Sequence, residues 1–405
     1  MRNIKYAILG GGPSGLTIAH ALISRGVPDH DVVVIEKERT VGGLCRSEEV
    51  DGAPLDIGGG HFLDVRNNEV LDFLFCFLPK DEWNEFERIA KIRLRVIEVD
   101  HPLESNLWQL PKADQVDYLE SISRARAVHG DPAPEAFADW IVWKLGERIA
   151  QDYMMPYNRK IWARDFGELG TYWLKKLPDV SFRETLRSCL DGRPLGSLPA
   201  HGRFLYPKRF GYGEVWRRMG EALGESLVAN CAVEAIDLVS RTINGRWRAG
   251  TIISTIPWTQ WPKFCAVGRE MESQMGALRR TSIDIDYVPH TLGSRSHWIY
   301  EPDEAIAYHR LLLRSNFCQA SRGYWTETNS CRSPSAVGWR HRNEFAYPVN
   351  TRGKPMAVTK ILEWAASKGI VGAGRWGKWE HMNSDVAVAE SLAAVKNHLA
   401  NGKWA

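Results

Sequence analysis

A glycine-rich turn near the N-terminus has the spacing of a phosphate-binding loop. Gly10, Gly12 and Gly15 form a Gly-x-Gly-x-x-Gly pattern between an apolar segment, residues 5–9, and a helix-like segment, residues 16–25. In a dinucleotide-binding βαβ unit the first glycine permits the tight turn and the second lets the backbone approach a pyrophosphate. The third allows the helix to pack closely on the strand. The N-terminus of the helix would then hold the phosphates.

The second strand of this unit ends on an acidic residue. Residues 31–35 are mostly β-branched and apolar, and Glu36 follows them, 21 residues after Gly15. A carboxylate at this place can accept a hydrogen bond from a ribose hydroxyl. Two further glycine clusters, in residues 41–47 and 55–61, are places where the backbone can pass close to a large ligand. They favour an elongated FAD over NAD alone.

The composition is that of an ordinary globular protein. The chain has 405 residues, 44% hydrophobic and 25% charged, and is long enough for two or three structural units. Its 52 basic and 49 acidic residues are too closely balanced to indicate nucleic acid as the main partner. No apolar run approaches the roughly 20 residues of a membrane span, and the first strand starts too early for a signal peptide. We therefore expect a cytoplasmic protein without membrane contacts.

The seven cysteines are dispersed along the chain without the paired spacing of a zinc site. We therefore expect no metal and no disulfide framework.

Several segments, in sequence order, resemble the UDP-galactopyranose mutases, in particular their eukaryotic-type branch. These enzymes belong to the FAD-binding superfamily that includes amine oxidases and protoporphyrinogen oxidases. The most specific pieces are Pro-Tyr-Asn-x-Lys-x-Trp-Ala in residues 156–163 and Gly-Arg-x-Gly-x-Trp in residues 374–379. Further matching segments are residues 56–61, 204–216, 254–257 and 298–300.

The resemblance implies an α/β protein with a discontinuous Rossmann-like FAD-binding domain, a helical domain and an antiparallel β-sheet substrate domain. Residues 1–66, 201–281 and 341–405 would form the three parts of the FAD-binding domain. Residues 67–200 would form the mainly helical domain, and residues 282–340 the antiparallel sheet. Within these parts, the patterns predict a returning strand over 251–257, a last strand over 369–375 and a closing helix over 384–401.

The resemblance also implies a function. The chain would be an isomerase of carbohydrate biosynthesis that interconverts the pyranose and furanose forms of a nucleotide-diphosphate sugar. N5 of reduced FAD would attack the anomeric carbon, and NADPH or NADH would be the reductant.

Three residues match catalytic positions of the family. Arg310, twelve residues after Trp298, matches the arginine that binds the diphosphate, where a bidentate cation suits two phosphates. Arg375 matches an arginine near the flavin and the pyrophosphate, and His61 matches a histidine of a loop against the flavin ring. From the residues alone, the alternatives are that Arg310 is a solvated strand residue and Arg375 a helix cap.

The remaining site residues follow from the same resemblance. Asn158 and Trp162 would line the sugar pocket, and the hydroxyls of Tyr300 and Tyr347 would reach the phosphates. Trp298, Lys176, His201, His381 and Asn383 complete the expected substrate site. The expected cofactor site comprises Gly10, Gly12, Pro13, Ser14, Gly15, Glu36, Lys37, Gly43, Leu44, Gly59, Gly60, His61, Val233, Thr255, Gly374, Arg375 and Asn383.

The nucleotide end departs from the family pattern. Leu177 stands where the family has a second diphosphate arginine, next to Lys176, which could supply a point charge without the planar fork. His201 stands where the family has an asparagine, and residues 101–104 read His-Pro-Leu-Glu in place of Tyr-Pro-Phe-Gln at the nucleotide base. An ionised Glu104 only accepts hydrogen bonds, so it suits guanine or cytosine better than uracil.

Two other classes of function stay open. One is a flavin oxidoreductase of the amine oxidase or protoporphyrinogen oxidase type, which would use the same FAD domain. The other is a non-catalytic nucleotide-sugar-binding homologue, which the leucine at position 177 would allow. The sequence leaves the sugar, the base, the physiological reductant and the oligomeric state open as well.

Overall fold

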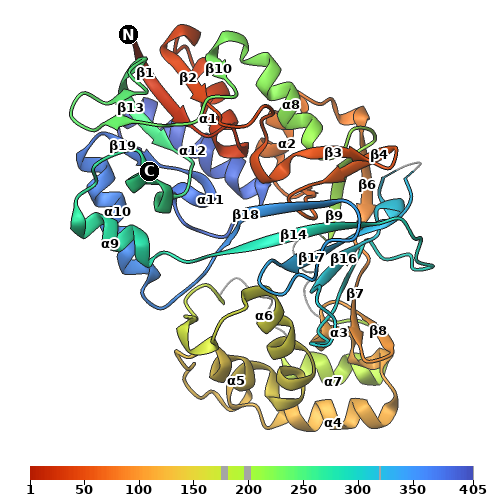
Figure 1. Cartoon of the computed structure of the whole chain (residues 1–405). Helices are drawn as coiled ribbons and strands as arrows, with labels where there is room; N and C mark the ends of the chain where they lie inside the picture. Colours follow the sequence, from red (N-terminus) through yellow and green to blue (C-terminus); the bar gives the residue numbers. More distant parts are fainter. Residues whose placement is uncertain (175–180, 196–201, 319–320, 405) are drawn as a thin grey trace.

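The computed structural model describes residues 1–174, 181–195, 202–318 and 321–404. They form an upper body around one sheet, a lower helical layer and a second sheet between the two (Figure 1). Both ends of the chain lie in the upper body. None of the helices in these residues has the length and apolar character needed to cross a bilayer.

The sheet of the upper body is mostly parallel and is assembled from segments far apart in the sequence. Its strand order is β10-β2-β1-β13-β12-β11, and β19 also pairs with β13. β1 pairs in parallel with β2 and β13, and β13 in parallel with β19. This arrangement confirms the α/β class and the discontinuous Rossmann-like unit. The strands are β1 (Arg2–Leu9), β2 (Val32–Ile35), β10 (Leu227–Val228), β11 (Ile236–Asp237), β12 (Thr242–Ile243), β13 (Trp247–Ser254) and β19 (Ile370–Gly372).

Helices cover both faces of this sheet because the side chains of its central strands alternate between two apolar cores. Ile8 and Val34 pack with residues of α1, α8 and α12, whereas Leu9 and Val33 pack with residues of α9 and α10. All four are fully buried, as is typical of parallel strands covered on both sides. The helices of this body are α1 (Pro13–Ile23), α2 (Asn68–Phe75), α8 (Gly213–Ala222), α9 (Arg269–Ala277), α10 (Lys354–Ser367), α11 (Gly374–Gly377) and α12 (Ser384–Asn401).

The second sheet confirms the expected antiparallel sheet and extends it. Its order is β18-β14-β17-β16-β15-β7-β8, and all its pairs are antiparallel except the parallel pair of β15 with β7. β18 runs across the boundary that we expected at residue 340. The strands are β7 (Ala90–Leu94), β8 (Ile97–Asp100), β14 (Arg280–Val288), β15 (Trp298–Tyr300), β16 (Arg310–Leu312), β17 (Tyr324–Asn329) and β18 (Arg340–Pro348).

The described residues form two smaller sheets as well, and one of them contains β6, a strand of the segment 67–200. A hairpin joins β3 (Ser47–Val50) to β4 (Ala53–Asp56), and β5 (Leu63–Asp64), β9 (Arg203–Pro207) and β6 (Trp83–Glu87) pair in the order β5-β9-β6. Residues 67–200 are therefore not only helical, because β6, β7 and β8 lie within them. The signal was present in β7, where Ala90, Ile92 and Leu94 are buried and the residues between them are half-buried.

The lower layer contains the predicted helices of the middle of the chain. Within residues 67–200, which we expected to be mainly helical, a π-helical turn, Ala150–Met154, joins α5 to α6. The helices of this layer are α3 (Leu103–Asn106), α4 (Lys112–Ser123), α5 (Phe137–Ile149), α6 (Met155–Trp162) and α7 (Phe182–Asp191).

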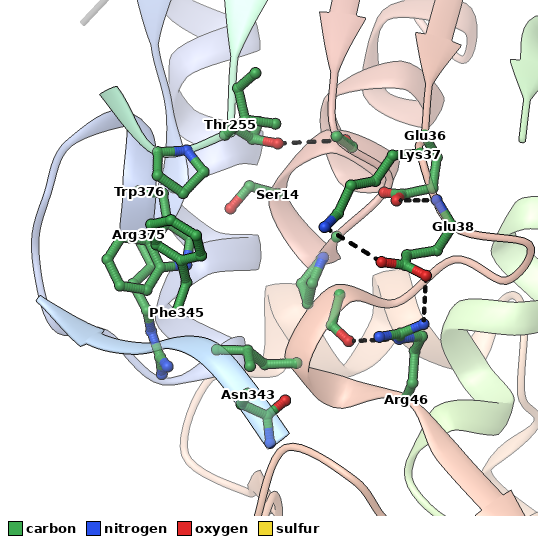
Figure 2. A pocket seen from close by; sticks show the side chains of 18 of the residues that line it. Ser14, Glu36, Lys37, Glu38, Arg46, Thr255, Asn343, Phe345, Arg375 and Trp376 are labelled. Atoms are coloured by element: carbon green, nitrogen blue, oxygen red, sulfur yellow. Dashed lines mark hydrogen bonds and ion pairs between the residues drawn. The ribbon is translucent and has the colours of Figure 1, made fainter. Parts of the chain in front are cut away.

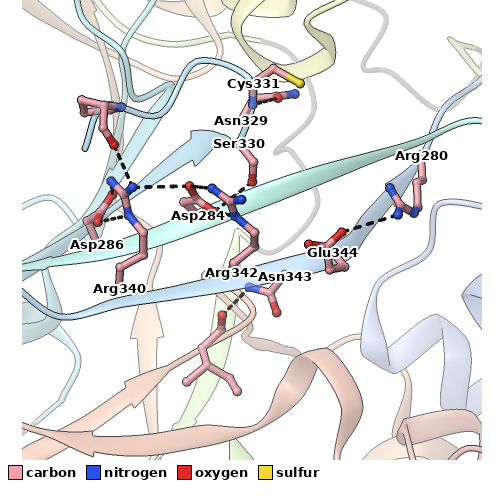
Figure 3. A network of polar contacts seen from close by, with 12 residues as sticks. Arg280, Asp284, Asp286, Asn329, Ser330, Cys331, Arg340, Arg342, Asn343 and Glu344 are labelled. Carbon is pink, nitrogen blue, oxygen red and sulfur yellow. Dashed lines mark hydrogen bonds and ion pairs between the residues drawn. The ribbon is translucent and has the colours of Figure 1, made fainter. Parts of the chain in front are cut away.

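A polar network ties β14 to β18 (Figure 3). Asp284 is fully buried and accepts two hydrogen bonds from Arg342, at 2.7 and 2.8 Å, and one from Ser330 at 2.9 Å. Burial opposes the ionisation of Asp284, but these donors hold its pKa at about 2. Asn343, which follows Arg342 on β18, donates to the carbonyl of Ile57 at 2.6 Å. The network therefore anchors the start of the loop that contains residues 58–61.

Candidate active site

An elongated cavity of about 930 Å³ follows the carboxyl ends of the parallel strands. This edge of a doubly wound sheet is where ligands bind in such folds. Figure 2 shows Glu36, Lys37 and Glu38 on one side of it, and Arg375 and Trp376 on the other. The predicted cofactor residues that line it are Gly10, Gly12, Pro13, Ser14, Glu36, Lys37, Gly43, Leu44, His61, Val233, Thr255, Gly374, Arg375 and Asn383.

The glycines of the turn have different surroundings. A Cβ atom at Gly15 would lie 2.0 Å from the carbonyl oxygen of Gly10, so Gly15 serves the packing of α1 on β1 and does not line the cavity. A Cβ atom at Gly12 would have its nearest neighbour, the Cα of Gly43, 3.9 Å away. The protein leaves room above Gly12, at the N-terminus of α1, where a phosphate can approach the backbone.

Glu36 is buried at the end of β2, and its carboxylate is partly engaged by the protein. It accepts from the backbone N–H of Gly11 at 2.7 Å and from that of Glu38 at 2.8 Å. Each oxygen keeps a second lone pair, so Glu36 can shape the glycine turn and still accept from a ribose hydroxyl. Lys37 lies at the rim, with its side chain 73% exposed and its Nζ 3.3 Å from Glu38.

A second cavity of about 480 Å³ lies between the antiparallel sheet and the helical layer. It meets the first cavity at His61, Arg375, Asn383 and Ser384, which line both. A ligand in one cavity can therefore touch a ligand in the other at this shared wall. The predicted residues that line the second cavity are Gly60, His61, Glu104, Asn158, Trp162, Trp298, Tyr300, Arg310, Tyr347, Arg375, His381 and Asn383.

Arg310, on β16, is held by a buried carboxylate of the neighbouring strand. Its Nε donates to Glu327 at 2.8 Å, and a terminal nitrogen lies 2.6 Å from the same oxygen. Burial disfavours the charge of Glu327, but Arg310 and the nearby His309 hold its pKa well below the usual range. The guanidinium thus lies on the cavity wall in a fixed orientation, and its charge is largely balanced by Glu327.

The loop that carries His61 depends on the same carboxylate. The backbone N–H of Gly60 donates to Oε1 of Glu327 at 2.9 Å. A Cβ atom at Gly59 would lie only 2.5 Å from that oxygen. From the sequence we expect a large ligand to approach these glycines closely, but at Gly59 the close neighbour is the protein itself. Gly59 lies outside both cavities, and Gly60 lines the second.

His61 is neutral at physiological pH. Burial and the nearby Arg375 lower its pKa to about 4. Its Nδ1 lies 3.1 Å from the carbonyl oxygen of Gly59, and because a carbonyl only accepts, this nitrogen carries the proton. The other ring nitrogen, Nε2, is then an acceptor.

Arg375 lies at the junction of the two cavities, at the start of α11. It donates to the carbonyl of Ala346 at 2.9 Å and to that of Met382 at 2.7 Å. These partners carry no formal charge, so they orient the guanidinium without cancelling its positive charge. Burial lowers the pKa of Arg375, but an arginine with an ordinary value above 12 stays protonated.

Aromatic residues form much of the second cavity. The indole N–H of Trp162 donates to the side chain of Asn158 at 2.9 Å, and Asn158 donates in turn to the carbonyl of Met154 at 2.7 Å. Asn158 therefore fixes the indole more than it offers free hydrogen-bonding groups. Tyr300 pairs in register with Arg310 across β15 and β16, and Tyr347 stacks obliquely on His381 at 5.2 Å.

The predicted base-recognition residue lines the second cavity and not the first. Glu104, on the short helix α3, lines the cavity, as does Lys144 of α5. Burial raises the pKa of Glu104, and the charge of Lys144 opposes this effect. Lys176 and His201, the two other predicted substrate residues, lie outside the described part of the chain.

Three lining or supporting residues were missed by the sequence analysis. Glu327 supports both Arg310 and Gly60, Asn343 anchors Ile57, and Arg88 lines the second cavity. A weak signal existed only for Glu327, which is a charged residue in an otherwise strand-like segment. Asn343 bonds to Ile57 and Arg88 lies over Trp298, and both of these partners are far away in the sequence, so spacing carried no information about them.

Comparisons with known sequences identify a Rossmann-like domain in the part of the chain that begins the first cavity. Residues 8–76 match the family described as NAD(P)-binding Rossmann-like domain. An uncharacterized protein in the nifH2 3' region of Methanothermococcus thermolithotrophicus is 54% identical over 55 residues, which cover 14% of this chain and 50% of that protein. A probable UDP-galactopyranose mutase of Klebsiella pneumoniae is 20% identical over 436 residues, which cover 99% of this chain and 96% of that protein.

Comparisons with solved structures extend over the whole chain. A reduced UDP-galactopyranose mutase superimposes with a TM-score of 0.87 at 23% identity, over 100% of this chain and 95% of that one. A putative protoporphyrinogen oxidase from Exiguobacterium sp. 255-15 gives a TM-score of 0.72 at 13% identity, over 98% and 99% of the two chains. The chain therefore has the fold of the reduced UDP-galactopyranose mutase over its full length, and this fold begins with an NAD(P)-binding Rossmann-like domain.

Proposed function

We propose that the chain is an FAD-dependent mutase that interconverts the pyranose and furanose forms of a nucleotide-diphosphate sugar. The observation that carries this proposal is the shared wall at His61 and Arg375, where a dinucleotide cavity meets a second cavity that contains Arg310. A mutase of this type needs its cofactor ring and its substrate in contact at one place. The likeness of the fold to UDP-galactopyranose mutase supports the assignment.

The residues of the first cavity fit FAD. The open space above Gly12 would take the pyrophosphate, and Glu36 would accept from the ribose. The cavity then runs past Leu44 to His61 and Arg375, so a flavin ring would lie against the shared wall. When bound and reduced, FAD would supply the nucleophile, N5, for the anomeric carbon.

The residues of the second cavity would bind and orient the sugar nucleotide. Arg310 would stabilise the negative charge of the diphosphate as it leaves the anomeric carbon, and Glu327 would keep the guanidinium in place during turnover. Trp162, fixed by Asn158, would pack on the sugar ring. The aromatic wall would keep water from the reacting carbon.

Glu104 supports a nucleotide other than a uridine nucleotide. Glu104 is half-buried and lines the second cavity; burial raises the pKa of its carboxyl, and the charge of Lys144 opposes this rise. An ionised carboxylate would accept from the amino group of cytosine or from the N–H groups of guanine, but it would repel a uracil carbonyl. We therefore propose a cytidine or guanosine diphosphate sugar as the substrate class.

The test is product analysis after reduction. The purified protein is supplied with FAD, treated with or without dithionite, and incubated with UDP-, CDP- and GDP-hexoses. Chromatography coupled to mass spectrometry should reveal a new isomer of unchanged mass only in the reduced samples. No isomer from any of these nucleotide sugars, or a protein that cannot be loaded with FAD, would reject the proposal.

The fold also allows an oxidoreductase, because the putative protoporphyrinogen oxidase shares it. The same assay separates the two functions. Bleaching of the oxidised flavin by substrate, with production of peroxide, would favour an oxidase. Binding of nucleotide sugars without any product would favour a non-catalytic binding protein.

A further inference from the structure

The nucleotide end of the second cavity contains an arginine that the sequence analysis did not consider. Arg88 lies in the link between β6 and β7 and lines the cavity that also contains Arg310. Its backbone N–H donates to the carbonyl of Gly202 at 2.9 Å. The next residue, Ile89, exchanges two hydrogen bonds with His297, at 2.8 and 3.0 Å. The link is therefore held by pairing on both sides.

Two of the neighbours of the Arg88 guanidinium are aromatic side chains of the cavity wall. It lies over the indole of Trp298, 5.3 Å from the ring centroid, and it hydrogen-bonds with Nδ1 of His101. Burial and the nearby Arg88 lower the pKa of His101 to about 3, so this imidazole is neutral. A neutral imidazole that accepts at Nδ1 carries its proton on Nε2. Arg88 thus keeps its positive charge and fixes His101 as a second donor.

Arg88 and His101 line the same cavity as Glu104 and Arg310. His101 begins the segment that ends at Glu104, and its ring packs 5.0 Å from that of Tyr300. Tyr300 in turn pairs in register with Arg310. Through Tyr300, the pair of Arg88 and His101 is therefore connected to Arg310 within one cavity.

The charge of the expected ligand indicates that the second cavity needs a further cation beside Arg310. A nucleotide diphosphate brings about two negative charges, whereas the charge of Arg310 is largely balanced by Glu327. Among arginines that line the second cavity in the described residues, Arg375 lies at the shared wall, near the cofactor. Arg88 is the arginine on the nucleotide side.

We propose that Arg88, together with the Nε2–H of His101, is the second cationic contact of the substrate diphosphate in this chain. It would take the place of the arginine that the family resemblance expects at Leu177. The histidine stands where the resemblance expects a tyrosine, so the pair is a feature of this chain. This inference rests on the proposed function, since it assigns residues to the same substrate site.

The test compares ligands that differ only in their phosphates. Isothermal titration calorimetry would measure the binding of cytidine, CMP and CDP, and of the matching guanosine series, to the FAD-loaded protein. Arg88→Met should weaken the diphosphate about 10- to 100-fold, as expected for loss of a hydrogen bond to a charged group. The nucleoside should lose less than about threefold. Arg88→Lys should recover part of the loss, because it keeps the charge but not the fork.

Two controls make the result specific. Arg310→Met should show the same dependence on phosphate number, and Arg126→Met, at an exposed ion pair with Asp131, should change nothing. Equal losses for nucleoside and diphosphate in Arg88→Met would show a merely structural role and overturn the inference. If Arg310→Met weakens CDP and GDP but Arg88→Met does not, the inference fails and the proposed function stands. If no nucleotide of either series binds to the parent protein, both fail.

Discussion

The substitution Gly12→Val separates the needs of the ligand from those of the fold. Gly12 has a φ of −78° and a ψ of −179° at the start of α1, a conformation open to any residue. A Cβ atom there would be 3.9 Å from the nearest protein atom. The added side chain would therefore enter only the cavity, in the space where we place the pyrophosphate.

The two expected magnitudes differ widely. For the protein alone, the gain from restricting the unfolded chain, about 0.4–1 kcal/mol, roughly cancels the loss of a favourable N-cap residue. The free energy of unfolding should then change by less than about 1 kcal/mol. For the complex, forcing a branched side chain into occupied space costs about 1–3 kcal/mol. This cost corresponds to FAD binding that is about 5- to 150-fold weaker.

The assay measures both quantities on the same variants. FAD affinity follows from titration of apoprotein with FAD, monitored by flavin fluorescence, and stability from thermal unfolding of the apoprotein. Gly276→Val is the matched control, because Gly276 has no atom within 4 Å of its Cβ position and lines neither cavity. Gly15→Val is the opposite control and should prevent folding, since its Cβ would lie 2.0 Å from a carbonyl oxygen.

Unchanged FAD affinity in Gly12→Val would refute the placement of the pyrophosphate. A large drop in the stability of apo Gly12→Val, comparable to that of Gly15→Val, would refute the claim that the space above Gly12 is free of protein.

Arg310→Ala should retain FAD but lose about 30- to 1,000-fold in turnover, because a desolvated contact to a leaving diphosphate contributes about 2–4 kcal/mol. The double variant with Glu327→Gln controls for the buried carboxylate, and unchanged rates would show that Arg310 does not contact the diphosphate. Glu104→Gln should shift nucleotide preference toward UDP, measured by titration of both proteins with UDP, CDP and GDP; tightest binding of UDP by the parent protein would contradict our base assignment. Burial lowers the pKa of His297 from 6.5 to about 4. The imidazole of His297 therefore binds a proton at a higher pH in the unfolded chain than in the folded one. The free energy of unfolding should fall by about 3 kcal/mol through His297 as the pH drops from 6.5 to 4. Urea titrations across this range should show a smaller fall for His297→Asn, which keeps an acceptor for the N–H of Ile89.

The fold was largely predictable from local patterns. The turn at Gly10 to Gly15, the strand that ends at Ser254 and the helix that starts at Ser384 each carry their own signals in spacing and caps. The strands β6 to β8 were missed because they are short, and because strong helical patterns surround them. The register of β7 against β15 joins residues about 200 positions apart, which local periodicity cannot reveal.

The candidate site was predictable where the residues themselves bind and less so where they support others. Arg310, Arg375 and His61 could be named from motifs, and all three line the second cavity. Glu327 could not, because its importance comes from two partners, Arg310 and the backbone of Gly60, which only the folded chain brings together. The same holds for Arg88, whose neighbour His101 belongs to a different strand connection.

The carboxylate of Glu327 connects Arg310 to the loop that carries His61, and from this contact we expect the two cavities to be coupled. One of its oxygens accepts from Arg310, which faces the substrate, and the other accepts from Gly60, in the loop beside the cofactor site. A ligand that draws the guanidinium of Arg310 away from Glu327 should strengthen the hydrogen bond from Gly60 to this carboxylate. A movement of the loop should in turn change how tightly Glu327 binds Arg310. Linkage requires this coupling to be reciprocal. Bound FAD should therefore change the affinity for the nucleotide by the same factor by which the bound nucleotide changes the affinity for FAD. Glu327→Gln should bring this factor closer to one.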